Sequence, residues 1–289
     1  MFVLIGWALS MACIFGVFIA HGGNIVVILE ALPFEMITIF GAATGAFLAN
    51  NQMKVVKATV AGLGTCFKGS KYSKARYMEL LALMYDILQK ARKEGLMSIE
   101  KDVDEPHNSP LFQKYPTVGN DHHVTEFITD YLRMMVSGNL NAHEIESLMD
   151  SEIETHHQEE HAAVAALQRL AGGLPAFGIV AAVLGVVNTM GSVGQPPAVL
   201  GGMIGSALVG TFMGVFLAYG LVGPMANRLK EVVDEEGSFY KIIQSVLVAH
   251  LHGNAAQISV EIGRGSVPSG AQPSFLELEE ALGAIPNEA

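Results

Sequence analysis

Residues 174–190 have the sequence LPAFGIVAAVLGVVNTM, and residues 199–223 have the sequence VLGGMIGSALVGTFMGVFLAYGLVG. No Asp, Glu, Lys, Arg or His occurs between residues 171 and 227. A helix needs about 20 predominantly apolar residues to cross the hydrocarbon core of a bilayer, which is roughly 30 Å thick. The stretch therefore predicts two membrane-spanning helices, at Ala171–Gly191 and Val199–Gly223.

Two more apolar stretches lie at the N-terminal end, at Met1–Ala20 and Phe34–Ala49. The second is shorter, and it has Glu35 near its start. Met1–Ala20 lacks the positively charged start of a signal peptide, so we expect it to be retained as a span. The fold class predicted is an all-α membrane protein with four transmembrane helices and a large helical cytoplasmic insert between spans 2 and 3.

The composition agrees with this class. Charged residues make up 16% of the chain and hydrophobic residues 51%, whereas soluble domains carry about 25% charged residues. The net charge of -11 argues against binding to nucleic acid, which requires Lys and Arg at the phosphates. Cys13 and Cys66 suggest neither a disulfide framework nor a zinc site.

The basic residues predict the orientation. The connections at 21–32 and 192–198 contain no Lys or Arg, whereas basic residues follow the second and fourth spans closely. Cytoplasmic loops carry the excess of Lys and Arg, so the long insert and the tail should be cytoplasmic. The expected domains are spans 1 and 2 at 1–50, a cytoplasmic helical domain at 51–170, spans 3 and 4 at 171–223, and a cytoplasmic C-terminal helix and tail at 224–289.

The insert shows helical periodicity. Apolar residues recur every three or four positions over 77–92, and Gly95 is a suitable stop. Three prolines exclude one regular helix over 103–118, and helical patterns resume at 123–137 and 142–170. In the tail, 224–251 should be helical and 263–273 flexible, and 275–282 is either a short amphipathic helix or, as we favour, a solvated terminus.

Small residues recur at four-residue spacing in two spans, at Gly41 and Gly45, at Gly201 and Gly205, and at Gly210 and Gly214. Such spacing allows helix backbones to approach closely in lipid. Packing within the chain and packing in an oligomer or against a partner helix are equally compatible with it.

Pro175 lies near the cytoplasmic start of the third span, and Pro224 lies just after the fourth. The simpler interpretation makes Pro175 a helix start and Pro224 a helix stop. The alternative is that both act as hinges between membrane and cytoplasm.

Two charged clusters have simple explanations. His157, Glu160 and His161 match the H-x-x-E-H pattern of some zinc enzymes, but they lie in an acidic helical run, so we expect an exposed helix face and no metal. Arg92 and Glu100 flank the break at Gly95 together with Lys90, which suits either a solvated face or docking on a charged protein surface.

None of the predicted spans has a carboxylate at mid-depth, and Thr189, Ser206 and Thr211 offer hydroxyl groups only. Proton relays in membranes need a titratable group. If this chain takes part in ion transport, another chain must therefore supply the carboxylate.

Several segments together resemble the MotA family of flagellar motor stator subunits, in its longer proton-type form, and the resemblance covers almost the whole chain. These segments are Lys71-Tyr-Ser-Lys, Gly95-Leu-Met-Ser-Ile-Glu100, 130–138 (DYLRMMVSG), 146–154 (ESLMDSEIE), 174–187 (LPAFGIVAAVLGVV) and 273–280 (PSFLELEE).

The resemblance implies a bacterial inner-membrane protein without enzymatic activity or cofactor. Five copies would surround two copies of MotB, whose single span supplies the ion-binding aspartate and whose other domain anchors the unit to the cell wall. Ion flow would turn the ring against the rotor protein FliG.

The resemblance also assigns roles to individual residues. Arg92 and Glu100 match the rotor-contact pair, and Pro175 and Pro224 match the prolines that couple ion flow to movement. Pro175 is also expected beside the ion path, where Thr211 matches a threonine near the MotB aspartate. Ala182 stands where sodium-driven members have a threonine, so the expected ion is H⁺.

Two alternatives remain at this point. One is an ExbB/TolQ-type energiser of envelope transport, although those proteins usually have three spans. The other is a membrane metalloenzyme built on His157 and His161, which would need a third ligand and an open position on the metal.

Overall fold

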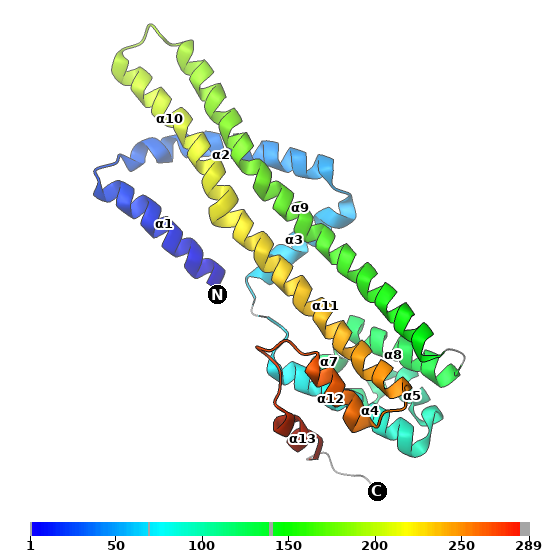
Figure 1. Ribbon diagram of the computed structural model, residues 1–289. Coiled ribbons are helices and arrows are strands. Elements are labelled where there is room, and N and C mark those ends of the chain that lie inside the picture. The colour runs from blue at the N-terminus through cyan, green and yellow to red at the C-terminus, as the bar shows by residue number, and fades with distance from the viewer. Residues whose placement is uncertain (1, 69, 139–140, 284–289) are drawn as a thin grey trace. The chain divides into compact units, whose positions relative to one another are not determined.

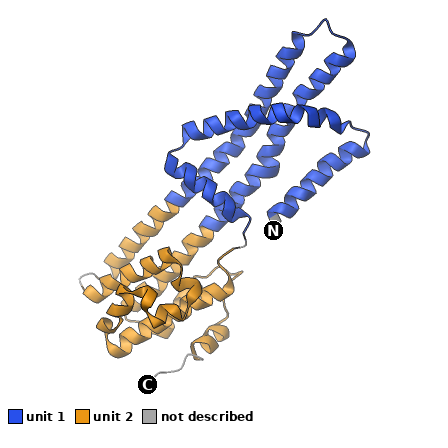
Figure 2. Cartoon of the chain, turned by 180° about the vertical axis from the view of Figure 1, so that it is seen from behind, with its two compact units in different colours: residues 1–69, 159–233 blue, residues 70–158, 234–289 orange. Residues whose placement is uncertain are grey.

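The computed structural model describes residues 2–68, 70–138 and 141–283, and all regular structure in these residues is helical (Figure 1). The chain divides into two compact units (Figure 2). Unit 1 comprises residues 1–69 and 159–233, and unit 2 comprises residues 70–158 and 234–289. Four helices are long and apolar enough to cross a membrane, with a large helical segment between the second and third, which confirms the predicted fold class.

Unit 1 contains the apolar helices. Its elements are α1 (Phe2–Ala20), α2 (Ile25–Asn50), α3 (Met53–Cys66), the second part of α9 (Ala142–Met190), α10 (Pro197–Phe216), the π-helical segment η3 (Leu217–Val222) and the start of α11 (Gly223–Leu251). Figure 1 shows α9 and α10 as antiparallel neighbours joined by a short loop.

The second span is longer than predicted. Helix α2 begins at Ile25, nine residues before the expected start, because the Asn24 side chain accepts a hydrogen bond from the Val26 amide and caps it. Pro33, Glu30 and Glu35 all lie inside the helix, so none of them ends it. The predicted loop at 21–32 shrinks to a turn at 21–24, and Glu35 lies well inside the helix.

The helix that contains the predicted third span begins well before Ala171. Helix α9 runs for 49 residues through Pro175, so the interpretation of this proline as a helix start is wrong. A proline in a helix interior removes one backbone hydrogen bond and favours a bend.

The helical segment that contains the predicted fourth span also continues beyond Gly223. After Phe216 the helix widens into η3, where the Gly223 amide bonds to the Ala218 carbonyl five residues back. Pro224 follows at the start of α11, so its interpretation as a stop is wrong, while the predicted helix over 224–251 is confirmed. A π-type turn before a proline is a local change of helical register of the kind that is frequent at functional sites.

The helices of unit 1 pack through small residues. A Cβ atom at Gly178 of α9 would lie 2.7 Å from the Gly210 carbonyl oxygen and 2.9 Å from the Gly214 Cα of α10. At Gly185 it would lie 2.6 Å from the Cβ of Ala207. Only small side chains permit this approach, as expected for helices that meet in lipid.

Unit 2 is built from shorter helices. They are α4 (Lys74–Glu94), η1 (Leu96–Ile99), α5 (Glu100–Asp104), η2 (Pro106–Asn108), α6 (Pro110–Gln113), α7 (Pro116–Gly119), α8 (His122–Ser137), α12 (Ala256–Gly265) and α13 (Phe275–Gly283), together with the first part of α9 and most of α11. Each proline between 103 and 118 starts a short helix, which confirms that this region is not one helix.

A core of large side chains holds unit 2 together. Fully buried members come from α4 and from α11, and α8 covers them with Ile128 and Leu132. The central ones are Tyr77, Leu80, Leu83, Met84, Ile87, Phe239, Ile242 and Val246.

The tail is more ordered than predicted. Arg264 donates to the Pro273 carbonyl at 3.0 Å and Gln272 donates to the Arg264 carbonyl at 2.9 Å, so 263–273 is tied down and not a free link. Helix α13 packs on α4 and buries Leu278 and Leu282, so the solvated-terminus interpretation is wrong for residues 275–283.

Candidate functional site

The two expected rotor-contact charges lie on either side of one turn in unit 2. Arg92 is in the last turn of α4, and Glu100 is the first residue of α5. The chain reverses between them at Gly95, whose φ of 90° is strained for a residue with a side chain. Arg92 and Glu100 are both exposed, so both charges are available to another protein.

A buried carboxylate joins the two sides of this turn. Asp102 of α5 accepts a hydrogen bond from Lys90 of α4 at 2.8 Å and another from the Ser109 hydroxyl at 2.7 Å. Asp102 is 8% exposed and Ser109 is 3% exposed. A buried carboxylate with two partners holds both elements in place, because losing either partner leaves a charge poorly solvated.

The end of α11 lies within the electrostatic range of the turn. Burial lowers the pKa of His250 below its usual value, and the charge of Arg92 lowers this pKa further. His250 is therefore neutral at pH 7, and it adds no second positive charge beside Arg92.

In unit 1, three spans meet beside the expected ion-path residues. A Cβ atom at Gly210 of α10 would lie 3.2 Å from the Ala181 Cβ of α9 and 2.6 Å from the Glu35 Oε2 of α2. Thr211 directly follows Gly210, and Ala182 directly follows Ala181. The structure therefore brings the helices of both predicted ion-path residues together. Ala182 is buried, and Thr211 is half-buried.

Glu35 was missed as a candidate in the sequence. Helix α2 starts earlier than the hydropathy pattern indicated, so Glu35 lies inside this membrane-capable helix and not at its start. The missed signal is the cap at Asn24.

The two prolines lie apart from this contact along the chain. Pro175 is half-buried in α9, three residues before the close approach at Gly178. Pro224 is the second residue of α11, two positions after the end of η3.

The glycine faces differ in what they contact. Gly210 and Gly214 are filled by packing within the chain. A Cβ atom at Gly41, Gly45 or Gly201 would meet no atom of the described chain within 4 Å. Both interpretations of the glycines therefore have support, but for different glycines.

The H-x-x-E-H pattern falls across the boundary between the units. His157 belongs to unit 2, where its Nε2 lies 3.6 Å from Asp234 Oδ1 on α11. Glu160 and His161 belong to unit 1. The ring centroids of the neighbouring His156 and of Tyr240 are 5.3 Å apart.

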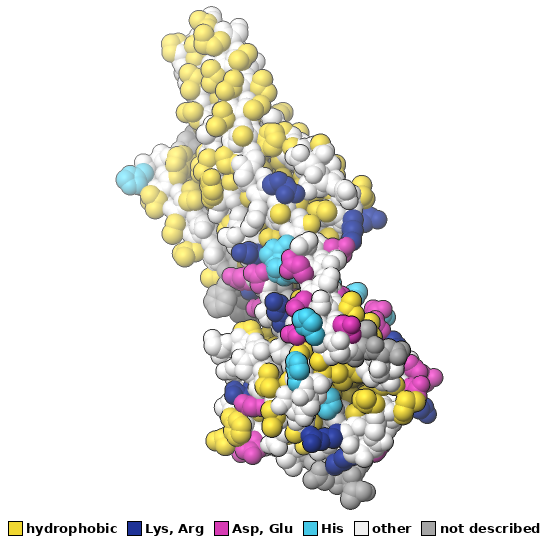
Figure 3. All heavy atoms as spheres, turned by 45° about the vertical axis from the view of Figure 1, so that its right-hand side comes forward, with side chains coloured by type: hydrophobic (Ala, Val, Ile, Leu, Met, Phe, Trp, Pro, Cys, Tyr) yellow, Lys and Arg dark blue, Asp and Glu magenta, His cyan; other side chains and the backbone are white. Residues whose placement is uncertain are grey.

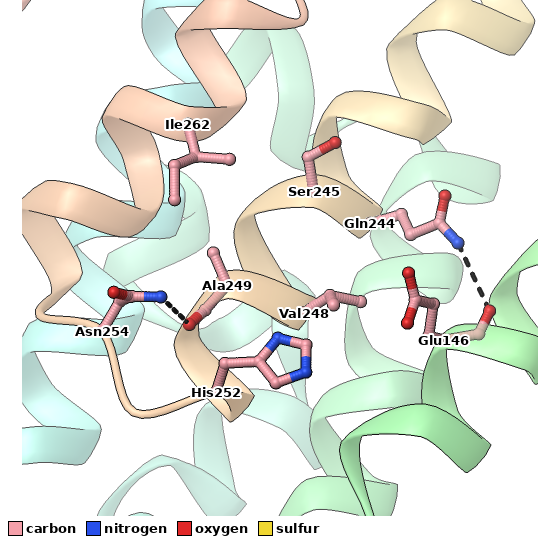
Figure 4. A pocket seen from close by; sticks show the side chains of 8 residues that line it. All are labelled: Glu146, Gln244, Ser245, Val248, Ala249, His252, Asn254 and Ile262. Atoms are coloured by element: carbon pink, nitrogen blue, oxygen red, sulfur yellow. Dashed lines mark hydrogen bonds between the residues drawn. The ribbon is translucent and has the colours of Figure 1, made fainter.

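A cavity of about 320 Å³ opens between α9, α11 and α12 in unit 2 (Figure 4). Among its lining residues, Gln244 donates a hydrogen bond to the Glu146 carbonyl at 3.3 Å, and Asn254 donates one to the Ala249 carbonyl at 2.8 Å. None of the predicted site residues lines it.

Two family models match the chain. The motility protein A N-terminal model matches residues 4–95, and the MotA/TolQ/ExbB proton channel family model matches residues 120–241. The four membrane-capable helices agree with these matches and indicate a multi-pass membrane protein.

Full-length relatives give the same result. The chain is 42% identical to motility protein A of Escherichia coli (strain K12) over 99% of its own length and 97% of that protein. It is 41% identical to motility protein A of Salmonella typhimurium over the same shares, and 33% identical to chemotaxis protein LafT of Vibrio parahaemolyticus over 94% and 95%.

Solved structures share the fold. The structure of C. jejuni MotAB matches with a TM-score of 0.76 at 20% identity, covering 94% of this chain and 98% of that chain. The flagellar MotAB stator complex from Bacillus subtilis matches with a TM-score of 0.71 at 23% identity, covering 89% and 92%. By full-length sequence identity, the chain belongs to the motility protein A family.

Proposed function

We propose that the chain is a flagellar motor stator subunit that conducts protons together with a MotB-type partner and converts their flow into torque. The observation that carries this proposal is the incomplete surface of unit 1. A Cβ atom would meet no atom of the described chain within 4 Å at Gly41, Gly45, Gly201 or Gly202. None of the residues of the apolar stretch Val3–Ala20 of α1 is buried within the described chain. Open small-residue faces on spanning helices are suited to packing against other spans.

Both matching solved structures are of MotAB complexes, and the proposed assembly follows them. Five copies of this chain would surround two copies of MotB, which supply the ion-binding aspartate and the cell-wall anchor. The bilayer and the FliG-type rotor protein complete the list of proposed partners, and no resident cofactor is proposed.

Unit 2 would lie in the cytoplasm. Basic residues follow α2 at Lys54 and Lys57 and follow η3 at Arg228 and Lys230, whereas the loops at 21–24 and 191–196 have none. The positive-inside rule then sets the orientation. No Asp, Glu, Lys, Arg or His occurs between residues 171 and 227, and in Figure 3 the hairpin formed by the end of α9 and the start of α10 carries hydrophobic side chains.

The ion path would run beside α10. Thr211 and Ala182 lie next to the contact of α2, α9 and α10, and Pro175 lies on the same helix as Ala182. Alanine at 182 offers no oxygen to replace a sodium ion's hydration shell, which favours H⁺. Protonation of the partner's aspartate would let it move past Thr211.

Movement would pass along α9 and α11. Pro175 lies inside α9, and Pro224 follows the π-helical segment, so each helix has a weak point in its hydrogen bonding. One charge crossing 100 mV releases about 2.3 kcal/mol, which is enough to bias a step between two states that differ by a few kcal/mol. The moving surface would be the turn with Arg92 and Glu100.

The test is to co-express the chain with its candidate partner in a motor-deficient host. Swimming should survive without sodium and stop when the proton gradient collapses. Sodium dependence would overturn the ion assignment alone. A well-assembled complex without motility would contradict the stator role and favour an ExbB/TolQ-type energiser.

A second measurement separates conduction from assembly. Thr211→Ala should reduce swimming strongly and leave the purified complex intact, because Thr211 is only half-buried and alanine removes little packing there. Loss of the assembled complex in detergent would contradict this role for Thr211.

A further inference from the structure

The turn between Arg92 and Glu100 has an apolar tip. Met97 is 66% exposed and Leu96 is 39% exposed. Unlike the exposed apolar side chains of the spans, these two lie in unit 2, outside any membrane-capable helix. An exposed methionine beside charged residues suits a protein contact, because its flexible thioether adapts to an uneven surface.

The tip is held rigidly. The Ser98 amide and hydroxyl both donate to the Gly95 carbonyl, at 3.0 Å and 2.7 Å, and they close the 3-10 turn. Ile99 is completely buried beneath the tip. Asp102 binds Lys90 before the turn and Ser109 after it. A pre-ordered tip loses little conformational entropy when it binds.

Charged residues flank the apolar tip on both sides. Arg92 and Lys93 are the basic residues of the last turn of α4, and Glu100 opens α5. Glu94 and Lys101 are also exposed, so the net attraction of this rim for a partner is small. The charges can therefore set the orientation of a partner, while the apolar tip supplies most of the contact energy.

We propose that Met97 and Leu96 form a docking knob that inserts into an apolar recess of the rotor protein, with an acidic side facing Arg92 and Lys93 and a basic side facing Glu100. This proposal rests on the rotor contact proposed above and adds an anchor to it. Arg92 and Glu100 would then select the register of the contact, and the knob would hold it during each step.

The test uses the full chain in complex with its MotB-type partner, with purified FliG-type rotor protein as the probe. Met97→Ser should weaken binding about tenfold or more, because burying a methionine side chain fully contributes enough for such a change. It should also lower stall torque. Met97→Leu should restore both values.

Ile258→Ser is the matched control. Ile258 lies in α12 of the same unit and is 53% exposed, so its substitution changes exposed apolar area without touching the turn. It should leave rotor binding and torque unchanged. An equal loss in both serine variants would overturn the proposal.

Other outcomes are distinct. Normal binding in Met97→Ser with weak binding in Arg92→Glu would overturn the knob and leave the charged contact standing. Normal binding and torque in all these variants would overturn the rotor contact as well. A changed mass of the stator complex in Met97→Ser would place the tip between copies of this chain and overturn the knob.

Discussion

The two units are held together in different ways. Unit 2 surrounds large, fully buried side chains such as Tyr77, Leu83 and Phe239. Unit 1 brings helix backbones together at Gly178 and Gly214, and it leaves many large apolar side chains on its surface. Burial in water rewards large apolar side chains, whereas helices in lipid gain mainly from close packing. Unit 2 therefore has a complete core of its own, while unit 1 leaves open glycines and many large apolar side chains on its surface.

The largest effect should come from filling the glycine contact in unit 1. Gly214→Leu puts a side chain where a Cβ atom alone would lie 2.8 Å from both the Gly178 Cα and the Leu174 carbonyl oxygen. Backbone atoms cannot turn aside, so the cost should exceed about 3 kcal/mol, and the folded complex should be lost. Yield and thermal unfolding in detergent measure this.

Gly202→Leu is the control for that substitution. Gly202 is in the same helix, but a Cβ there would meet no atom of the described chain within 4 Å. The subunit should fold, and any defect should appear in assembly with other chains. Equal loss of folding in both variants would contradict the distinction between filled and open glycines.

The same substitution in each unit sharpens the comparison. Ile87 of unit 2 is 1% exposed, and Ile39 of unit 1 is fully buried. Ile87→Ala should lower the free energy of unfolding by about 2–5 kcal/mol, because less apolar surface is removed from water on folding and a cavity is left in the core. Ile39→Ala should cost less, because its unfolded reference state still lies in lipid and only packing is lost. Equal costs, measured by denaturation of the purified complex, would show that both units depend on packing alone.

Much of unit 2 could be predicted from local patterns. The period of α4, its end at Gly95 and the short proline-led helices all follow from residues close in sequence. The docking of α13 could not be predicted in this way. It depends on Arg264 reaching the Pro273 carbonyl and on Lys74 reaching Glu277 at 2.7 Å, across a separation of about 200 residues.

In unit 1, hydropathy located the four spans but not their ends. Asn24 starts α2 early, and Pro175 and Pro224 both lie within continuous helical segments, the second of them just after a π-type turn. The contact of Glu35 with Gly210 depends on three helices at once, so no pattern within one helix predicts it. The roles of Thr211, Ala182, Arg92 and Glu100 came from resemblance and stay predictions.

A buried ion pair gives the next effect in size. Arg76 binds Asp121 at 2.6 Å in unit 2, with side chains 10% and 18% exposed. Burial alone would raise the pKa of Asp121, but the hydrogen bond from Arg76 and the charge of Lys71 outweigh it, so the pKa lies below its ordinary value of 3.8. Asp121→Asn should cost about 2 kcal/mol at pH 7, because it leaves Arg76 buried without a counter-charge.

The pH dependence follows from the sign of that shift. Asp121 stabilises the fold above the ordinary pKa of 3.8, and this contribution is lost as the pH falls through the lowered pKa. The Asn variant should lack this part of the acid-induced loss of stability, as urea titrations of the complex at several pH values can show. Asp104→Asn is the control, since Asp104 is 58% exposed in its pair with Arg133. The same pH response in both variants would contradict a special role for Asp121.

The smallest effect should come from an ion pair of unit 1. Lys54 of α3 and Glu159 of α9 meet at 2.7 Å, almost as close as Arg76 and Asp121 at 2.6 Å, but their side chains are 72% and 54% exposed. Exposed pairs are screened by water and contribute about 0–1 kcal/mol, so Lys54→Gln should change stability by no more than about 0.5 kcal/mol. A double-mutant cycle with Glu159→Gln measures the coupling directly. A coupling well above 1 kcal/mol would mean that water does not reach this pair in the assembled complex. Lipid headgroups or another chain would then cover a surface that the single chain leaves open, and the incompleteness of unit 1 would extend from its apolar faces to its charged edge.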